Sequence, residues 1–313
     1  MKAAAVCFCA FLPLWAQTTR AVESSYAYDI NGRRVPTGWS VTRQTGPGES
    51  KTVEHALSPN GRLVPREAVV ERIIRDDASG RVVERTVIPY DPNGAPGPPV
   101  KVRIEETPEA AGGKRVVETT WRGDINGAFR LSERAVTEVR RAGDTEIATT
   151  TVARPKWDGS LETFERTEAE THKTKDGSKA RISTYRPDPN GRFHETERQV
   201  VETKEAGSET VTNLQQYRVR GSQLVLDGQT LSRTVKRDGG EVTEVDILRT
   251  DVPGRPTVPG RPALVERQTI QRIQSPGGLK ETVLSRLASP NDAGKLEAPR
   301  VIAERTCTGQ CAP

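Results

Sequence analysis

The sequence predicts an all-β fold, an antiparallel meander of about eight β-hairpin repeats that forms an extended, spiral or barrel-like sheet. Three observations support this prediction. Turn motifs containing glycine recur about every 32 residues. The segments between them are rich in Val and Thr, and Leu, Ile, Val and Phe are too scarce for a large packed core. Because β-branched residues suit pleated, half-buried surfaces, we expect strands between the turns.

Residues 1–16 predict an export signal. Lys2 precedes an uncharged, mostly apolar run that extends to Trp15, and Ala16 supplies a small residue at the expected cleavage point. This order is typical of a secretory signal peptide. We therefore expect an extracytoplasmic protein, whether periplasmic, secreted or at the cell surface, with a flexible leader over residues 17–25.

Hydropathy argues against a membrane span, and the distribution of charge argues against a nucleic-acid partner. The apolar run at the start is too short to span a bilayer, and no apolar stretch of about 20 residues follows it. We therefore expect no membrane span. Lys and Arg total 47 and Asp and Glu total 42, with both signs interspersed along the chain. No nucleic-acid partner is expected, because such a partner usually requires a concentrated basic surface.

Residues 26–250 form the main predicted repeat region. One glycine series marks longer Asn-Gly or Asp-Gly loops: Gly32, Gly61, Gly94, Gly127, Gly159 and Gly191. A second series lies between these loops and marks tight turns: Gly48, Gly80, Gly113, Gly143, Gly177, Gly207, Gly240 and Gly278. Glycine supplies the positive φ that such turns need. The two series together place a turn about every 16 residues, which predicts about 16 strands.

The predicted strands do not alternate cleanly between apolar and polar residues. Residues 134–141, for example, place both charged and apolar side chains on each of their two faces. A sheet packed on one side normally alternates strictly. We therefore expect a sheet that is wet on both faces or has a thin core. Cross-strand Glu–Arg and Thr–Thr pairs then carry much of the pairing energy, at roughly 0.2–1 kcal/mol each.

The last part of the chain interrupts the pattern and then resumes it. Prolines in residues 251–263 predict a long loop, because proline cannot donate to a strand ladder. Terminal hairpin repeats are expected over residues 264–306, followed by a tail, residues 307–313. This tail contains Cys307 and Cys311. Export favours a disulfide between them or with another chain, and a metal site is the alternative.

Several turns resemble the YD-repeat family of secreted β-hairpin proteins. The motifs are Tyr-Asp-Ile-Asn-Gly-Arg at residues 28–33, Tyr-Asp-Pro-Asn-Gly at residues 90–94 and a relaxed copy at residues 185–193. The resemblance implies β-hairpin repeats and export. It covers turns in about half of the chain, and the period here is longer than in that family. We therefore do not extend the resemblance to encapsulation or toxin delivery.

The sequence contains no recognisable reaction centre. The three histidines, His55, His172 and His194, lack partners at metal-ligand spacing. The Asp-x-Asn-Gly turn that begins at Asp124 superficially resembles a calcium loop, but its glycine comes too early, and an Asx-turn explains the residues without a metal. We expect no catalytic residues, no cofactor and no metal. A carboxylate pair built from distant residues stays open.

Three functions follow from these observations. The first is a secreted, non-enzymatic β-repeat protein with a structural or surface-interaction role. The second is a carbohydrate-binding module on the same scaffold, in which Trp121 and Trp157, each shortly before a glycine loop, stack on sugars. The third is an exported hydrolase with an unrecognised carboxylate pair. The expected partner is unknown, with a polysaccharide or another surface protein as the leading classes.

Overall fold

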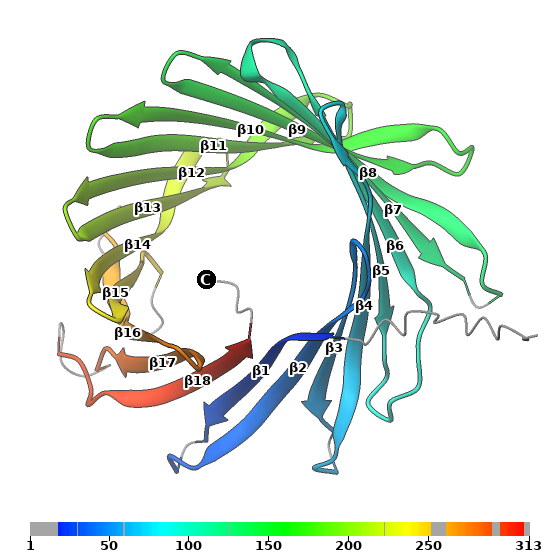
Figure 1. Ribbon diagram of the computed structural model, residues 1–313. Helices are drawn as coiled ribbons and strands as arrows, with labels where there is room; N and C mark the ends of the chain where they lie inside the picture. Colours follow the sequence, from blue (N-terminus) through cyan, green and yellow to red (C-terminus); the bar gives the residue numbers. More distant parts are fainter. Residues whose placement is uncertain are drawn as a thin grey trace, which may run out of the picture.

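The computed structural model describes residues 18–29, 31–58, 60–124, 126–221, 223–251, 261–289 and 295–309. Within these residues, 18 antiparallel strands form one sheet. Its first strand, β1 (Thr18–Tyr28), pairs with its last, β18 (Arg300–Gly309). The sheet is therefore closed into a barrel, and Figure 1 shows the strands following one another around a ring. The all-β meander is confirmed, and the barrel-like alternative is the one observed.

The remaining strands pair with their neighbours in chain order. They are β2 (Arg34–Gly46), β3 (Glu49–Leu57), β4 (Leu63–Asp77), β5 (Gly80–Pro89), β6 (Val100–Pro108), β7 (Lys114–Gly123), β8 (Phe129–Ala142), β9 (Thr145–Pro155), β10 (Leu161–Thr174), β11 (Gly177–Pro187), β12 (Phe193–Ala206), β13 (Glu209–Arg220), β14 (Gln223–Arg237), β15 (Gly240–Arg249), β16 (Ala263–Ser275) and β17 (Gly278–Leu287). A single helical turn, η1 (Ala110–Gly112), joins β6 to β7.

The predicted count of about eight hairpins was too low. The tight turns from β2 to β17 correspond to the predicted hairpins, but β1 and β18 lie outside them and close the ring. Most of the leader expected over residues 17–25 falls within β1, and Cys307 of the expected tail lies in β18. Residues 1–16, and most of the Pro-rich loop at 251–263, lie outside the described residues.

The connections alternate between the two ends of the barrel. Each even-numbered strand from β2 to β16 leads into a tight turn, or into η1, and each odd-numbered strand up to β17, except β13, leads into a longer loop. We call the end of the barrel with the tight turns the tight-turn end. Strand β1 begins there and strand β18 ends there. The opposite end is the loop end. There the predicted Asx-turns are confirmed, since Asp124 Oδ1 accepts hydrogen bonds from the backbone N–H of Asn126 and of Ala128, both at 2.9 Å.

β-Bulges near the loop end interrupt the alternation between the two faces, whereas residues 134–141 carry mixed side chains on both faces without a bulge. Eight ladders shift register at the same level, at Ser25/Tyr26, Glu54/His55, Thr120/Trp121, Thr163/Glu165, Thr184/Tyr185, Gln216/Tyr217, Ile247/Leu248 and Val283/Leu284. Each bulge adds one residue to one strand. On the strand that carries the bulge, odd-numbered and even-numbered residues therefore exchange faces at that point. Side chains no longer alternate with a period of two across the bulge.

The barrel has no packed core of the usual kind. The buried apolar side chains among the described residues are few, and all except Cys307 lie on strands β4 to β8: Ala68, Val82, Val83, Val117, Val139 and Cys307. The chain exposes 21247 Å², whereas a compact monomer of 34.3 kDa exposes roughly 13,000 Å². The wall is thus a single layer exposed on both sides. None of the helices in the described residues has the length and apolar character needed to cross a membrane.

Gly177 and Gly191 both have a positive φ, but only Gly177 lacks space for a Cβ atom. Alanine substitutions at these positions therefore distinguish backbone strain from a steric clash. Gly177 has a φ of 147°, and a Cβ there would lie 1.9 Å from the Thr203 carbonyl oxygen. Gly191 has a φ of 79° and open space around its Cβ position. We expect Gly191→Ala to lower the free energy of unfolding by about 1–2 kcal/mol. Gly177→Ala should cost more, because the β11–β12 ladder must also move. Denaturant unfolding of both variants measures this difference, and an equal loss contradicts the close approach at Gly177.

Candidate functional site

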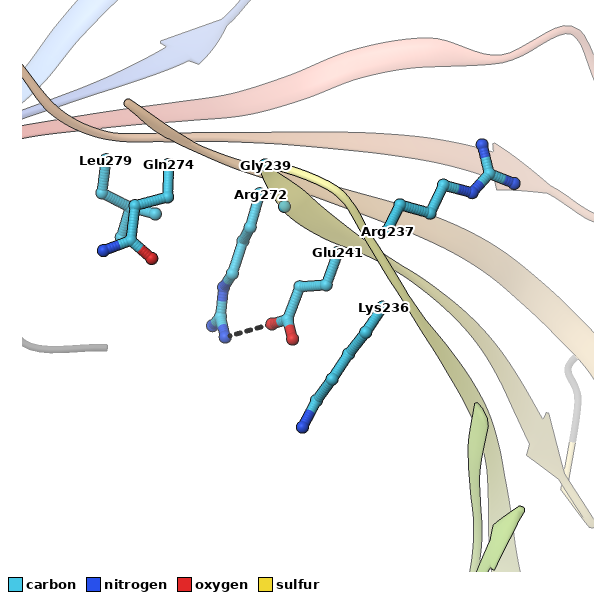
Figure 2. Close-up of a pocket in the computed structure, with 8 residues that line it drawn as sticks. Lys236, Arg237, Gly239, Glu241, Arg272, Gln274 and Leu279 are labelled. Carbon is cyan, nitrogen blue, oxygen red and sulfur yellow. Dashed lines mark hydrogen bonds and ion pairs between the residues drawn. The ribbon is translucent and has the colours of Figure 1, made fainter. Parts of the chain in front are cut away.

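The two faces of the wall can be assigned from one cluster of side chains. Figure 2 shows Lys236, Glu241 and Arg272 extending from the sheet toward the interior of the barrel, while Arg237 points to the opposite side. Residues opposite each other in a ladder share a face, and consecutive residues in a strand lie on opposite faces. The register therefore extends the inner and outer faces around the barrel.

A row of alternating charges lines the inner face near the tight-turn end. In register order it consists of Lys236, Glu241, Arg272, Glu281 and Arg305, and it ends at Glu23 of β1. Arg272 donates to Glu241 at 3.0 Å and to Glu281 at 2.5 Å. Arg305 donates to Glu23 at 2.7 Å across the β1–β18 seam. We call this set the inner charge row. It joins the strands that close the barrel.

The middle of the inner face is mostly uncharged from β8 to β15. Its side chains are Ala135, Thr137, Ala148, Thr150, Val152, Thr167, Ala169, Ala180, Ile182, Thr184, Gln199, Val201, Thr212, Leu214, Thr230, Ser232, Thr243, Val245 and Ile247. The predicted Thr–Thr pairs occur here, and Thr137 and Thr150 lie 2.8 Å apart between their hydroxyl oxygens. Toward the loop end, inner ion pairs resume, including Arg154–Glu133 and Arg186–Glu165.

The inner arginines remain accessible to water. The side chain of Arg272 is 41% exposed, that of Arg186 is 53% exposed and that of Arg154 is 60% exposed. Side chains that filled the interior would bury these groups, because a packed interior leaves few voids larger than a water molecule. The described wall therefore surrounds a hydrated interior.

The outer face combines ion pairs with an apolar belt. In the middle of the wall Arg267 donates to Asp246 at 2.6 Å, and near the tight-turn end Arg233 donates to Glu209 at 2.8 Å. Near the loop end the outer face carries apolar cross-strand pairs, which we call the outer belt: Tyr26–Pro36, Leu57–Leu63, Trp121–Leu131, Pro155–Leu161, Pro187–Phe193, Tyr217–Leu226, Leu248–Leu264 and Leu284–Val301. The belt occurs at every loop-end strand pair except β5–β6 and includes exposed Leu63 and Phe193.

The structure does not bring the two predicted sugar-stacking tryptophans together. Trp121 lies in the outer belt on β7, where it lines a cleft with Lys101 and Phe129. Trp157 lies in the β9–β10 loop and is 98% exposed. Beside it, the Ser160 hydroxyl and backbone N–H donate to Asp158 and hold the pKa of that carboxyl below its usual value. Sugar binding by Trp121 and Trp157 stays a prediction.

The remaining candidates contribute no reactive cluster. No group of three or more metal-ligating residues occurs within the described part of the chain. Cys307 is buried on the inner face of β18, and Cys311 lies outside the described residues. Their pairing therefore stays a prediction. Sequence reasoning missed the inner charge row, although the charged residues that flank the tight turns, such as Lys236 and Glu241, would have indicated it once the faces were known.

No family model and no curated protein matches this chain. A mutant porin from Rh. blastica has a TM-score of 0.50 at 9% identity, over 92% of this chain and 98% of that chain. A BenF-like porin from Pseudomonas fluorescens has a TM-score of 0.49 at 11% identity, over 93% and 97%. A Bacteroides fragilis protein of unknown function has a TM-score of 0.31 at 12% identity, over 40% and 88%. At these identities the likeness to the Rh. blastica porin concerns the fold alone.

The prediction of no membrane span was wrong. It rested on the lack of an apolar stretch of about 20 residues, which is a test for helices only. The closed barrel and its likeness to a porin overturn it, because a barrel satisfies its backbone hydrogen bonds between strands and can cross a bilayer with them.

The inner charge row should stabilise the closed barrel. Arg272→Gln leaves Glu241 and Glu281 without their shared cation, and we expect the free energy of unfolding to fall by about 1 kcal/mol at low salt and by less at high salt. Arg140 on the outer face is 78% exposed and lies 3.5 Å from Glu138. We expect Arg140→Gln to change stability by at most a few tenths of a kcal/mol. Denaturant titrations at two salt concentrations compare the variants. Equal effects contradict a special role for Arg272.

Proposed function

We propose that this chain is a non-enzymatic, channel-forming β-barrel of the outer cell envelope. The observation that carries the proposal is a closed wall with a hydrated interior, lined by arginines that remain 41–60% exposed. Barrels of about eight strands fill their interior with side chains, whereas barrels of 16–18 strands leave an aqueous channel. The observed sheet of 18 strands belongs to the second class.

The arrangement of the ends supports the same function. Outer-membrane barrels have an even number of strands, short turns at one end and longer loops at the other. This chain has tight turns at one end and Asx-type loops at the other, with β1 beginning and β18 ending beside the tight turns. The expected export signal also suits an envelope location.

The outer belt gives the barrel a surface for lipid. Aromatic and aliphatic girdles on the outside of a barrel position it at a membrane interface, and a large exposed apolar patch normally marks an interaction surface. The remainder of the outer wall is charged, and many of its charges neutralise one another in pairs such as Arg267–Asp246 and Arg181–Glu170. Lipid contact is therefore centred on the belt.

Inner charges mostly occur in ion pairs, so we expect a channel with weak preference between small cations and anions. The processed chain, folded in detergent and added to a planar lipid bilayer, should give stepwise conductance in KCl. In a salt gradient the reversal potential should lie close to zero. Absence of conductance steps from folded protein contradicts the channel.

Two neighbouring residues provide a matched test of the lumen. Lys236 lies on the inner face and Arg237 on the outer face, one position apart on β14. We expect Lys236→Glu to shift the reversal potential toward cation selectivity, because it adds negative charge to the conduction path. Arg237→Glu makes the same change of charge outside the barrel and should leave the reversal potential unchanged. Equal shifts contradict the proposed conduction path.

A further inference from the structure

A cleft on the outer face of β2 and β3 has the composition of a ligand site. Its volume is about 370 Å³, and its lining residues are Trp39, Val41, Arg43, Thr45, Lys51, Val53 and His55. The register places it outside the barrel, because Arg305 pairs with Ser25 and Ser25 pairs with Gly38, which puts Gly38 on the inner face and Trp39 on the outer face.

Two cations at one end of this cleft have no counter-ion. Arg43 and Lys51 lie directly opposite each other in the β2–β3 ladder, and both are exposed. None of the ion pairs among the described residues includes either of them. Glu49, the acid that follows the turn, is already paired with Arg72 at 2.5 Å. Opposed like charges destabilise a strand pair. A bound anion would reduce the repulsion between Arg43 and Lys51.

The other end of the cleft is aromatic and contains an unsatisfied polar atom. The ring centroids of Trp39 and His55 lie 5.0 Å apart, with the planes tilted by 40°. Trp39 is 38% exposed, so part of the indole remains available to a ligand. The Nδ1 atom of His55 is buried and has no hydrogen-bond partner. A buried polar atom without a partner is costly. Because His55 lines the cleft, a rotation of its ring would let a polar group of a ligand supply that partner.

A second aromatic cleft on the outer face provides a contrast. It includes Lys101, Arg103, Trp121 and Phe129. There the Lys101 ammonium lies 4.3 Å from the centre of the Phe129 ring, and Arg103 pairs with Glu105 at 2.6 Å. The cations of that cleft are engaged, whereas Arg43 and Lys51 are available for a ligand.

We propose that the β2–β3 cleft binds a phosphate monoester. The phosphate lies between Arg43 and Lys51, since guanidinium and ammonium groups are the usual phosphate partners. The organic part of the ligand lies against Trp39 and offers a polar group to His55. This chemistry occurs in the head group of an anionic lipid and in a soluble phosphorylated small molecule. The site is independent of conduction, because it lies outside the barrel.

Binding can be measured on the full processed chain in detergent. Calorimetric titrations use inorganic phosphate and glycerol phosphate, and co-flotation uses phosphatidylcholine vesicles with and without phosphatidic acid. The test variant is Arg43→Gln with Lys51→Gln. The matched control is Lys179→Gln with Arg181→Gln, which removes two outer-face positive charges on β11. Circular dichroism confirms that both variants fold.

We expect the test variant to bind at least about tenfold more weakly than wild type, because it loses two charge-assisted contacts. The control should bind like the wild type. If the protein binds both glycerol phosphate and phosphatidic acid vesicles, the site exists and accepts a phosphate monoester from a soluble molecule or from a lipid. If it binds the vesicles alone, the ligand is the lipid head group. Equal binding by test and control variants, or no binding to any probe, overturns the proposal whatever the conductance measurements give.

Discussion

Closure of the backbone ladder between β1 and β18 is the constraint on which the rest of this structure depends. A single-layer wall with few buried side chains gains little from hydrophobic burial. Its stability instead comes from inter-strand hydrogen bonds and cross-strand pairs, and an open sheet would leave two edges unpaired. Seven residues of β1, from Ala21 to Ala27, pair with β18. The contact between Arg305 and Glu23 adds a charged pair at the same seam.

Turn chemistry made the strand order predictable from the sequence, but closure was not. The two glycine series located the hairpins between β2 and β17, because a turn that needs a positive φ favours glycine at that position in the sequence. The first and last strands leave no such mark, since their pairing joins residues more than 270 positions apart, such as Ala27 and Ala303. A leader was expected where β1 lies for this reason. The faces were hidden as well, because a bulge at Thr184/Tyr185 and its equivalents changes the side-chain parity within a strand.

The candidate sites were less predictable than the fold, and the reason is again the register. Trp121 and Trp157 were singled out because both precede a glycine, yet position within a loop does not determine which side chains share a surface. Arg43 and Lys51 lie eight positions apart in the chain, with a turn between them, and only the ladder places them opposite each other. The same holds for Lys236 and Glu241. Residue type identified candidate chemistry, and cross-strand pairing determined which candidates meet.

The distribution of charge over the two faces links stability to the proposed channel function. Ion pairs on the outer wall, such as Arg233–Glu209, hold strands together from outside the barrel, and the inner charge row does so with side chains that line the interior and stay partly exposed. An apolar core would need side chains that fill the barrel, and a filled barrel conducts nothing. A wall stabilised by cross-strand polar pairs can stay open at this strand number. The scarcity of Leu, Ile, Val and Phe, which in the sequence argued against a packed core, is therefore the composition that a hollow barrel requires.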